Sequence, residues 1–201
     1  MRNSLLVVLG FAALSILPGI ALAGPPAICH PFDIGDARSL PWGDGRHTWN
    51  APLASYQVNR LVADTLALLS ADTPVLVRME TMRRATIYGA KDHRIAYELL
   101  ARLTARALNA EAAGKPSAPA WFDAGYLAET YRQAIFIYKW DMLEPAEKNA
   151  WTMRDSEVDG IDGYAWVLKA LHLGGDVAAM EFGAGLLREG KPSQEHFRKA
   201  A

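Results

Sequence analysis

The residue types best suited to binding a ligand are gathered in one short stretch, residues 42–49. Two glycines permit a tight turn there, and a tryptophan stands at each end. Indole rings can stack on a sugar or a peptide, while the charged side chains between them can form hydrogen bonds with it. The sequence therefore predicts a binding site in this turn. Its candidate residues are Trp42, Asp44, Arg46, His47 and Trp49.

The same turn allows a second hypothesis, a hydrolase. Asp44 and His47 are three residues apart and could serve as acid and base. This hypothesis requires the fold to bring at least two of the nearby polar side chains into one concave pocket, where their pKa values would be shifted. The side chains concerned are His30, Asp33, Asp44, His47 and His93.

Other kinds of catalytic or metal site lack their sequence signals. The five histidines form no pair four residues apart and no His-Glu-x-x-His motif, so we expect them to be structural or solvent-facing. A Gly-x-Ser-x-Gly nucleophile elbow is missing, and Cys29-His30 lacks the second cysteine that covalent haem attachment needs. We therefore expect no cofactor and no metal.

Cys29 is the only cysteine, so the chain can form no intramolecular disulfide. Ile28 and Phe32 flank it, and an unmodified cysteine behaves as a small hydrophobic residue. We expect it to be buried.

A basic cluster is formed by Arg78, Arg83 and Arg84, with Arg94 farther along. Three acidic residues lie close enough in the sequence to neutralise it. They are Glu80, Asp92 and Glu98. The pattern is typical of a solvated, salt-bridged surface, and Glu80 and Arg84 are spaced to pair on the outer face of a helix.

The predicted site lies in a segment without helical or strand periodicity, residues 24–50. This segment is rich in Pro, Gly and Asp, yet it holds too many large apolar residues for a disordered leader. We expect an extended arm that packs on the remainder of the chain.

Residues 51–201 show helical periodicity throughout, and no stretch has the alternation of a strand. The fold class predicted is all-α, an irregular antiparallel array of six to seven helices with an extended N-terminal arm. A polar stretch at 141–160 is the best candidate for an internal boundary. The expected helices are 52–70, 73–89 with Thr73 as N-cap, 91–112, 117–140, 162–173, 176–189 with Asp176 as N-cap, and a short one from 193, with a helical turn at 145–153.

Two parts of this array, from Ala124 to Ala134 and from Ala165 to Ala179, resemble tetratricopeptide units, which place small residues where paired helices approach. The repeat spacing of that family does not recur, so the resemblance implies only a similarity of helix packing.

The first 23 residues have the pattern of a cleavable signal peptide: Arg2, an apolar run, and Ala21-Leu22-Ala23. We expect cleavage after Ala23 and a periplasmic or secreted product without a membrane span. Removal of 23 of the 201 residues leaves 178, and loss of Arg2 changes the formal charge from −1 to −2. This balance gives no reason to expect a nucleic-acid partner.

Together these observations predict an exported, soluble helical protein. The first functional hypothesis is a non-enzymatic binding or scaffolding module for a protein, peptide or glycan. The alternative is the hydrolase assembled from the arm.

Overall fold

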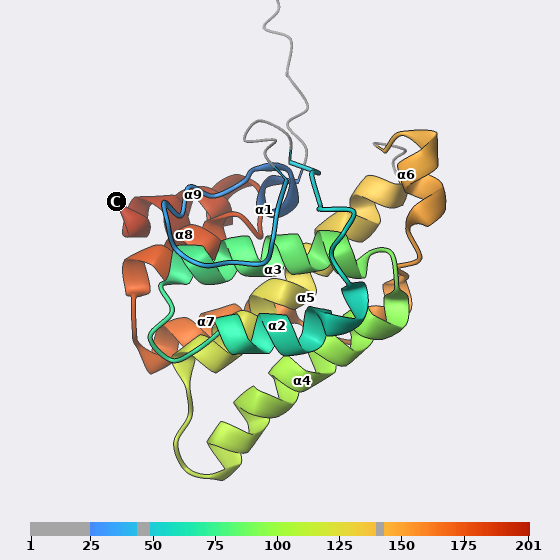
Figure 1. The fold of residues 1–201 in the computed structure, drawn as a ribbon. Helices are drawn as coiled ribbons and strands as arrows, with labels where there is room; N and C mark the ends of the chain where they lie inside the picture. Colours follow the sequence, from blue (N-terminus) through green and yellow to red (C-terminus); the bar gives the residue numbers. More distant parts are fainter. Residues whose placement is uncertain (1–24, 44–48, 140–142) are drawn as a thin grey trace, which may run out of the picture.

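The computed structural model describes residues 25–43, 49–139 and 143–201, and these are helical or irregular, with no strand among them (Figure 1). The all-α prediction is confirmed. In chain order the α-helices are α1 Pro26–Cys29, α2 Leu61–Leu68, α3 Val75–Gly89, α4 His93–Ala112, α5 Ala118–Lys139, α6 Pro145–Ala150, α7 Gly163–Leu173, α8 Val177–Gly185 and α9 Gly190–Ala200. Two short 3-10 helices, Val58–Arg60 and Asp155–Glu157, accompany them.

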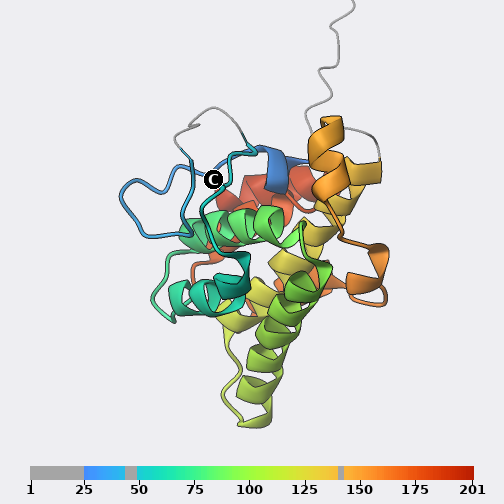
Figure 2. The same ribbon diagram turned by 45° about the vertical axis from the view of Figure 1, so that its right-hand side comes forward.

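Helix α3 is the centre of the array. Thirteen of its fifteen residues are buried, charged ones included. The N-terminal arm passes over one side of it, and α2, α5 and α8 pack around the others (Figures 1 and 2). A helix buried on nearly every side has no solvent-facing surface for charges, so its charged side chains need partners within the protein.

The tightest helix pair is α5 with α7. A Cβ atom at Gly125 would lie 2.4 Å from the carbonyl oxygen of Gly163, and one at Gly163 would lie 2.6 Å from the carbonyl oxygen of Gly125. The backbones therefore touch where both helices lack a side chain. Trp121 and Trp166 pack edge to face beside this contact, with ring centroids 5.7 Å apart.

The arm is packed, as the sequence predicts. Its first residues form the single turn α1, in which Ala27 and Ile28 are fully buried. Farther along, Leu40 is also fully buried. The arm is thus part of the hydrophobic core and not a loose leader.

The predicted helix 52–70 is wrong in its first half, because α2 begins only at Leu61. The backbone N–H of Leu53 donates to the hydroxyl of Tyr88 on α3 at 2.9 Å, and the N–H of Tyr56 closes a turn on the carbonyl of Leu53. These bonds to another element replace the helical ones.

Thr73 is not the N-cap of α3, since that position is Pro74. The Thr73 hydroxyl instead donates to the carbonyl of Leu68 at 2.8 Å and accepts from the N–H of Ser70 at 3.1 Å. It therefore closes the α2–α3 loop and does not start the helix.

The C-terminal helices are divided differently from the expectation. Asp176 is the N-cap, as predicted, but α8 ends at Gly185 and α9 already begins at Gly190. A Cβ at Gly185 would lie 2.6 Å from the ring of Phe197, so this glycine lets α9 cross close over α8.

Buried arginine–carboxylate pairs hold the loops of this array. Asp123 on α5 accepts from Arg78 at 2.7 Å and from Arg106 at 2.5 Å. Both guanidinium groups also donate to carbonyl oxygens of the α2–α3 loop, at Ser70 and Leu69 respectively. The ion pair thereby satisfies backbone groups of an irregular segment.

A second arginine–carboxylate pair also binds backbone groups of an irregular segment, the one before α7. Arg132 is bound to Glu129 and donates to the carbonyl oxygens of Val158 and Ile161. The same carboxylate oxygen of Glu129 also accepts from the backbone N–H of Tyr164 at 3.1 Å, at the start of α7.

Among the described residues, no helix is both long and apolar enough to cross a membrane.

Replacement of Gly125 by Ala should lower the free energy of unfolding by about 3 kcal/mol, because the new methyl group overlaps the α7 backbone. In an open helical position the same change stabilises by about 1 kcal/mol. Urea denaturation of the two proteins measures the difference. An unchanged or increased stability would contradict the close α5–α7 contact.

Candidate functional site: the groove beside the N-terminal arm

The carboxylate of Glu80 lies directly under the arm and is 1% exposed. It accepts two hydrogen bonds from Arg83, at 2.8 and 2.9 Å, and one from Arg84 at 2.7 Å. The backbone N–H of Phe32 in the arm donates to it at 3.1 Å. One side chain of α3 therefore binds two arginines and the arm together.

The two arginines complete the attachment. Arg83 donates to the carbonyl oxygens of Trp49 at 2.6 Å and Ile28 at 3.3 Å, and Arg84 donates to that of Leu40 at 2.7 Å. Backbone carbonyls of an irregular segment have no helical partners, and buried ones must find others. Here the arginines of α3 provide them at three points along the arm.

The expectation of a solvated basic surface is therefore wrong for this cluster. The side chains of Arg78 and Arg83 are 1% and 0% exposed, whereas that of Arg94 is 82% exposed. The Glu80–Arg84 pair forms as predicted but lies beneath the arm. Spacing four apart predicts such a pair equally well on a buried or an exposed face.

Burial alone would raise the pKa of Glu80, but hydrogen bonds and charge from Arg83, together with Arg84 and the arm amide of Phe32, hold that pKa below its ordinary value. The carboxylate is consequently ionised at neutral pH. A depressed pKa means that this group stabilises the folded chain above its ordinary pKa and loses that effect as the pH falls through the lower folded value.

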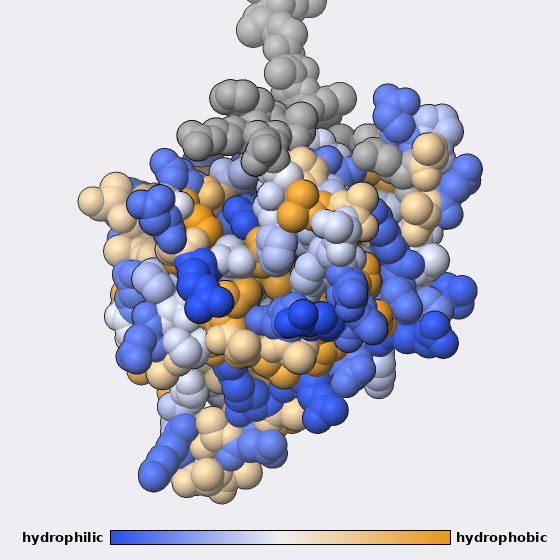
Figure 3. Space-filling view, viewed as in Figure 1, coloured by the Kyte–Doolittle hydropathy of each residue, from blue (hydrophilic) through white to orange (hydrophobic). Residues whose placement is uncertain are grey.

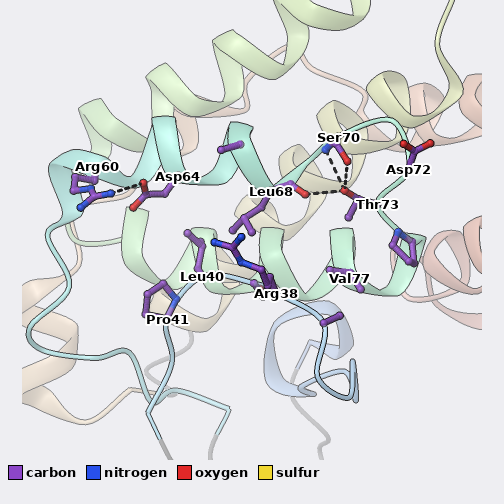
Figure 4. A pocket seen from close by; sticks show the side chains of 14 residues that line it. Arg38, Leu40, Pro41, Arg60, Asp64, Leu68, Ser70, Asp72, Thr73 and Val77 are labelled. Atoms are coloured by element: carbon purple, nitrogen blue, oxygen red, sulfur yellow. Dashed lines mark hydrogen bonds and ion pairs between the residues drawn. The ribbon is translucent and has the colours of Figure 1, made fainter.

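The strap formed by residues 37–41 separates two hollows. One of them, called here the arm groove, has a volume of about 680 Å³ and lies between the strap, α2 and the start of α3 (Figure 4). From the strap it is lined by Ala37, Arg38, Ser39, Leu40 and Pro41; from α2 and the preceding turn by Arg60, Asp64, Ala67 and Leu68; and from the α2–α3 loop and α3 by Ser70, Asp72, Thr73, Pro74 and Val77.

Seven of the fourteen residues that line the groove are apolar, with Leu40, Leu68 and Val77 among them. At one end Arg60 donates to Asp64 at 3.2 Å, so these two charges neutralise each other. Figure 3 shows apolar residues exposed between hydrophilic ones where the arm passes α2 and α3. The groove thus offers an apolar surface with few charged groups.

The groove has two further charged residues, Asp72 and, on the strap, Arg38. Arg38 is exposed, and its side chain extends into the arm groove between the strap and α2 (Figure 4). Among the described residues it has no ion-pair partner, whereas every arginine of the α3 cluster has one. A guanidinium group above an apolar surface is suited to bind a carboxylate with paired hydrogen bonds.

The second hollow lies on the other side of the strap and has a volume of about 770 Å³. Phe32 and Trp42 contribute to its walls, and Asp33 and Asp36 stand at its exposed edge. Asp33 accepts the backbone N–H of Gly35 at 3.0 Å, so its carboxylate shapes the turn.

Of the five predicted binding residues, the structure describes two. Trp42 is partly buried and packs edge to face on Tyr88, with centroids 5.7 Å apart, while Arg83 and Arg84 lie over its ring at 4.9 and 5.6 Å. Trp49 is partly buried against the core. Asp44, Arg46 and His47 lie outside the described residues, so the predicted site of the turn stays a prediction.

The described hydrolase candidates are not brought together. His30 is exposed at the end of α1, Asp33 lines the hollow beside the strap, and His93 lines a different hollow with Tyr97 and Glu157. In the part of the chain that the structure describes, no three His, Cys, Asp or Glu side chains are placed to hold a metal ion.

Sequence reasoning missed a polar constellation on the C-terminal helices. The ring of His196 on α9 is buried between Glu181 of α8 and the hydroxyl of Tyr164 of α7. The Tyr164 hydroxyl lies 2.6 Å from His196 Nε2, and Glu181 contacts His196 Nδ1. Three helices contribute one residue each, so no spacing in the sequence joins them.

Cys29 is partly buried, less completely than expected. Burial raises the pKa of its thiol to about 11, an effect that the positive charge of Arg83 opposes. The thiol is therefore protonated and a poor nucleophile at neutral pH.

No protein-family model, curated protein or solved structure matches this chain.

Replacement of Glu80 by Gln should lower the free energy of unfolding by about 3 kcal/mol at pH 7, because the buried guanidinium group of Arg83 and the partly buried one of Arg84 lose their counter-ion. Glu98→Gln is the matched control, since Glu98 also pairs with an arginine four residues on but is half exposed. It should change stability by about 0.5 kcal/mol or less. Because the pKa of Glu80 is depressed, the difference in the free energy of unfolding between wild type and Glu80→Gln should disappear as the pH falls below about 4. Chemical denaturation at several pH values measures it, and equal effects of the two substitutions would contradict the anchoring role.

The thiol of Cys29 should react slowly in the folded protein. A pKa of about 11 instead of 9.0 lowers the thiolate fraction at pH 8 about 100-fold. Ellman's reagent should therefore label the native chain at least about 100-fold more slowly than the chain in guanidinium chloride. Similar rates in the two conditions would show that the thiol is neither shielded nor shifted.

Proposed function

We propose that this chain is an exported binding protein whose arm groove receives an extended peptide segment carrying an acidic group. The observation that carries the proposal is the placement of Arg38 in an apolar groove without an ion-pair partner among the described residues. A carboxylate of the ligand would supply that partner.

The lining of the groove favours a peptide over a glycan. Sugar sites use aromatic faces for stacking, and the residues that line the arm groove include no Trp, Tyr or Phe. Accessible apolar side chains such as those of Leu68 and Pro74 are suited to the side chains of a peptide. In the α2–α3 loop that lines the groove, the exposed carboxylate of Asp72 offers an acceptor for a backbone amide or a basic group of the same ligand.

The wall of the groove is fixed before any ligand arrives. Leu40, within the strap, is fully buried and its carbonyl is held by Arg84. On the opposite wall Thr73 closes the α2–α3 loop, and Arg78 binds the carbonyl oxygens of that loop. A preformed groove reduces the entropy lost on binding, which supports a recognition role.

Export is the second part of the proposal. It is supported by the signal-peptide pattern that ends at Ala23 and by the burial of Ala27 and Ile28, which places the start of the core immediately after the expected cut. The mature chain would act in the periplasm or outside the cell.

Binding can be tested by fluorescence anisotropy with two pools of labelled octapeptides. Both pools have random Ala, Val and Leu positions and amidated C-termini, and they differ in one central residue, Glu or Gln. The Glu pool should bind about tenfold more tightly, as expected for one charge-assisted hydrogen bond. Arg38→Gln should abolish that preference, whereas Arg102→Gln, which changes an exposed arginine of α4 outside the groove, should preserve it. Absence of binding by either pool, or a preference that survives Arg38→Gln, would contradict the proposed function.

Processing can be tested by intact-mass analysis of the protein expressed from its full gene in a Gram-negative host. The mass should correspond to a chain that begins at Gly24, recovered from the periplasm or medium. Ala23→Leu should block the cut, because the residue before it must be small, while Ala13→Leu inside the apolar run should not. A full-length mass for the wild type would contradict this part of the proposal.

A further inference from the structure

The contact between Tyr164, His196 and Glu181, called here the C-terminal triad, has the arrangement of a nucleophile, a base and a residue that orients the base. The phenol oxygen and His196 Nε2 are 2.6 Å apart, and the opposite ring nitrogen contacts the Glu181 carboxylate. A side chain that can act as nucleophile, bonded to a base that a third group orients, is the geometric signature of covalent catalysis.

The tautomer of His196 follows from its partners. An ionised carboxylate can only accept hydrogen bonds, so Nδ1 carries the proton that Glu181 receives. In the neutral ring Nε2 then has the free lone pair, and the Tyr164 hydroxyl donates to it. The basic nitrogen is thus aimed at the phenol proton.

The arrangement is built by the close crossing of α8 and α9. Gly185 leaves room for the ring of Phe197, and the Ser193 hydroxyl donates to the carbonyl of Gly185 at 2.8 Å. The buried ring of His196 is thereby held against α8, while Tyr164 on α7 is partly exposed. Tyr164 is thus the one member of the triad that is partly exposed, since His196 and Glu181 are both buried.

Charges around the phenol limit the class of substrate. Arg188 lies over the Tyr164 ring at 4.1 Å, but Glu129 at 3.6 Å and Asp162 at 3.9 Å balance its charge. The surroundings therefore provide no net positive charge to attract an anionic substrate. An uncharged carboxylic ester fits them better.

We propose that the C-terminal triad is an acyl-transfer site at which Tyr164 attacks uncharged carboxylic esters with His196 as its base. The phenol oxygen bonds to the carbonyl carbon as its proton passes to His196 Nε2. The ester bond then breaks, and the leaving alcohol takes that proton. Water, deprotonated by His196, next attacks the acyl-tyrosine and releases the acid, which restores the Tyr164 hydroxyl. One ester and one water give one acid and one alcohol.

The test uses p-nitrophenyl acetate as the substrate and the mature chain as the enzyme. The wild type should release a burst of p-nitrophenolate equal to the protein concentration, and mass spectrometry of quenched digests should find one acetyl group on the peptide that contains Tyr164. Tyr164→Phe, which removes only the hydroxyl, should abolish both the burst and the label. His196→Gln should slow acylation about 100-fold, the usual contribution of a general base.

Tyr97→Phe is the matched control, because Tyr97 is a more exposed tyrosine (61%) outside the triad. It should leave the burst unchanged. Circular dichroism and thermal melting check that each variant is folded. If His196→Gln does not fold, Tyr164→Phe alone still tests whether Tyr164 is the nucleophile. A burst that survives Tyr164→Phe, an acetyl group found on other residues only, or no burst above that of the unfolded chain would overturn the proposal. None of these results depends on the arm groove, so the two proposals can fail separately.

Discussion

The attachment of the arm to α3 through Glu80 is the constraint on which the described structure depends most. An irregular segment that crosses a buried helix brings backbone carbonyls and amides out of water, and each one needs a partner. Glu80 binds the arm directly at Phe32 and holds Arg83 and Arg84 in position to bind the arm at other points. Without the carboxylate, the buried charge of Arg83 and the partly buried charge of Arg84 would remain without a counter-ion.

The same solution recurs at the other irregular segments. Asp123 positions Arg78 and Arg106 for the α2–α3 loop, and Glu129 positions Arg132 for the loop before α7. In each case a buried carboxylate on a helix orients arginines, and the arginines bind loop carbonyls. The polar groups of the core therefore order the loops, while apolar contacts such as that at Gly125 hold the helices together. The strap and the α2–α3 loop, which line part of the arm groove, are ordered in this way, while helices α2 and α3 line the remainder.

How much was predictable from the sequence differs between elements. Helix α4 follows from the spacing of Ala96, Leu99 and Leu103, and Asp176 caps α8 as predicted. The burial of Arg83 could not be predicted, because the pattern of charges on α3 is the same whether solvent or an arm covers that face. The C-terminal triad could not be predicted either, because it depends on how closely three helices cross. The arm groove lies next to the predicted turn, but its central arginine, Arg38, was not among the five candidates. No spacing or motif in the sequence singles out Arg38, because its place in the groove depends on how the strap packs on α2 and α3.

Hydrogen exchange of the arm amides, read by NMR, tests the central claim most directly. We expect Glu80→Gln to remove most of the protection of the Phe32 amide, whose acceptor is the Glu80 carboxylate, while amides in the middle of α5 and α7 keep theirs. Glu98→Gln should leave the Phe32 amide protected. If that amide keeps its protection when Glu80 is replaced, the carboxylate does not hold the arm, and the explanation given for the arm and its groove is wrong.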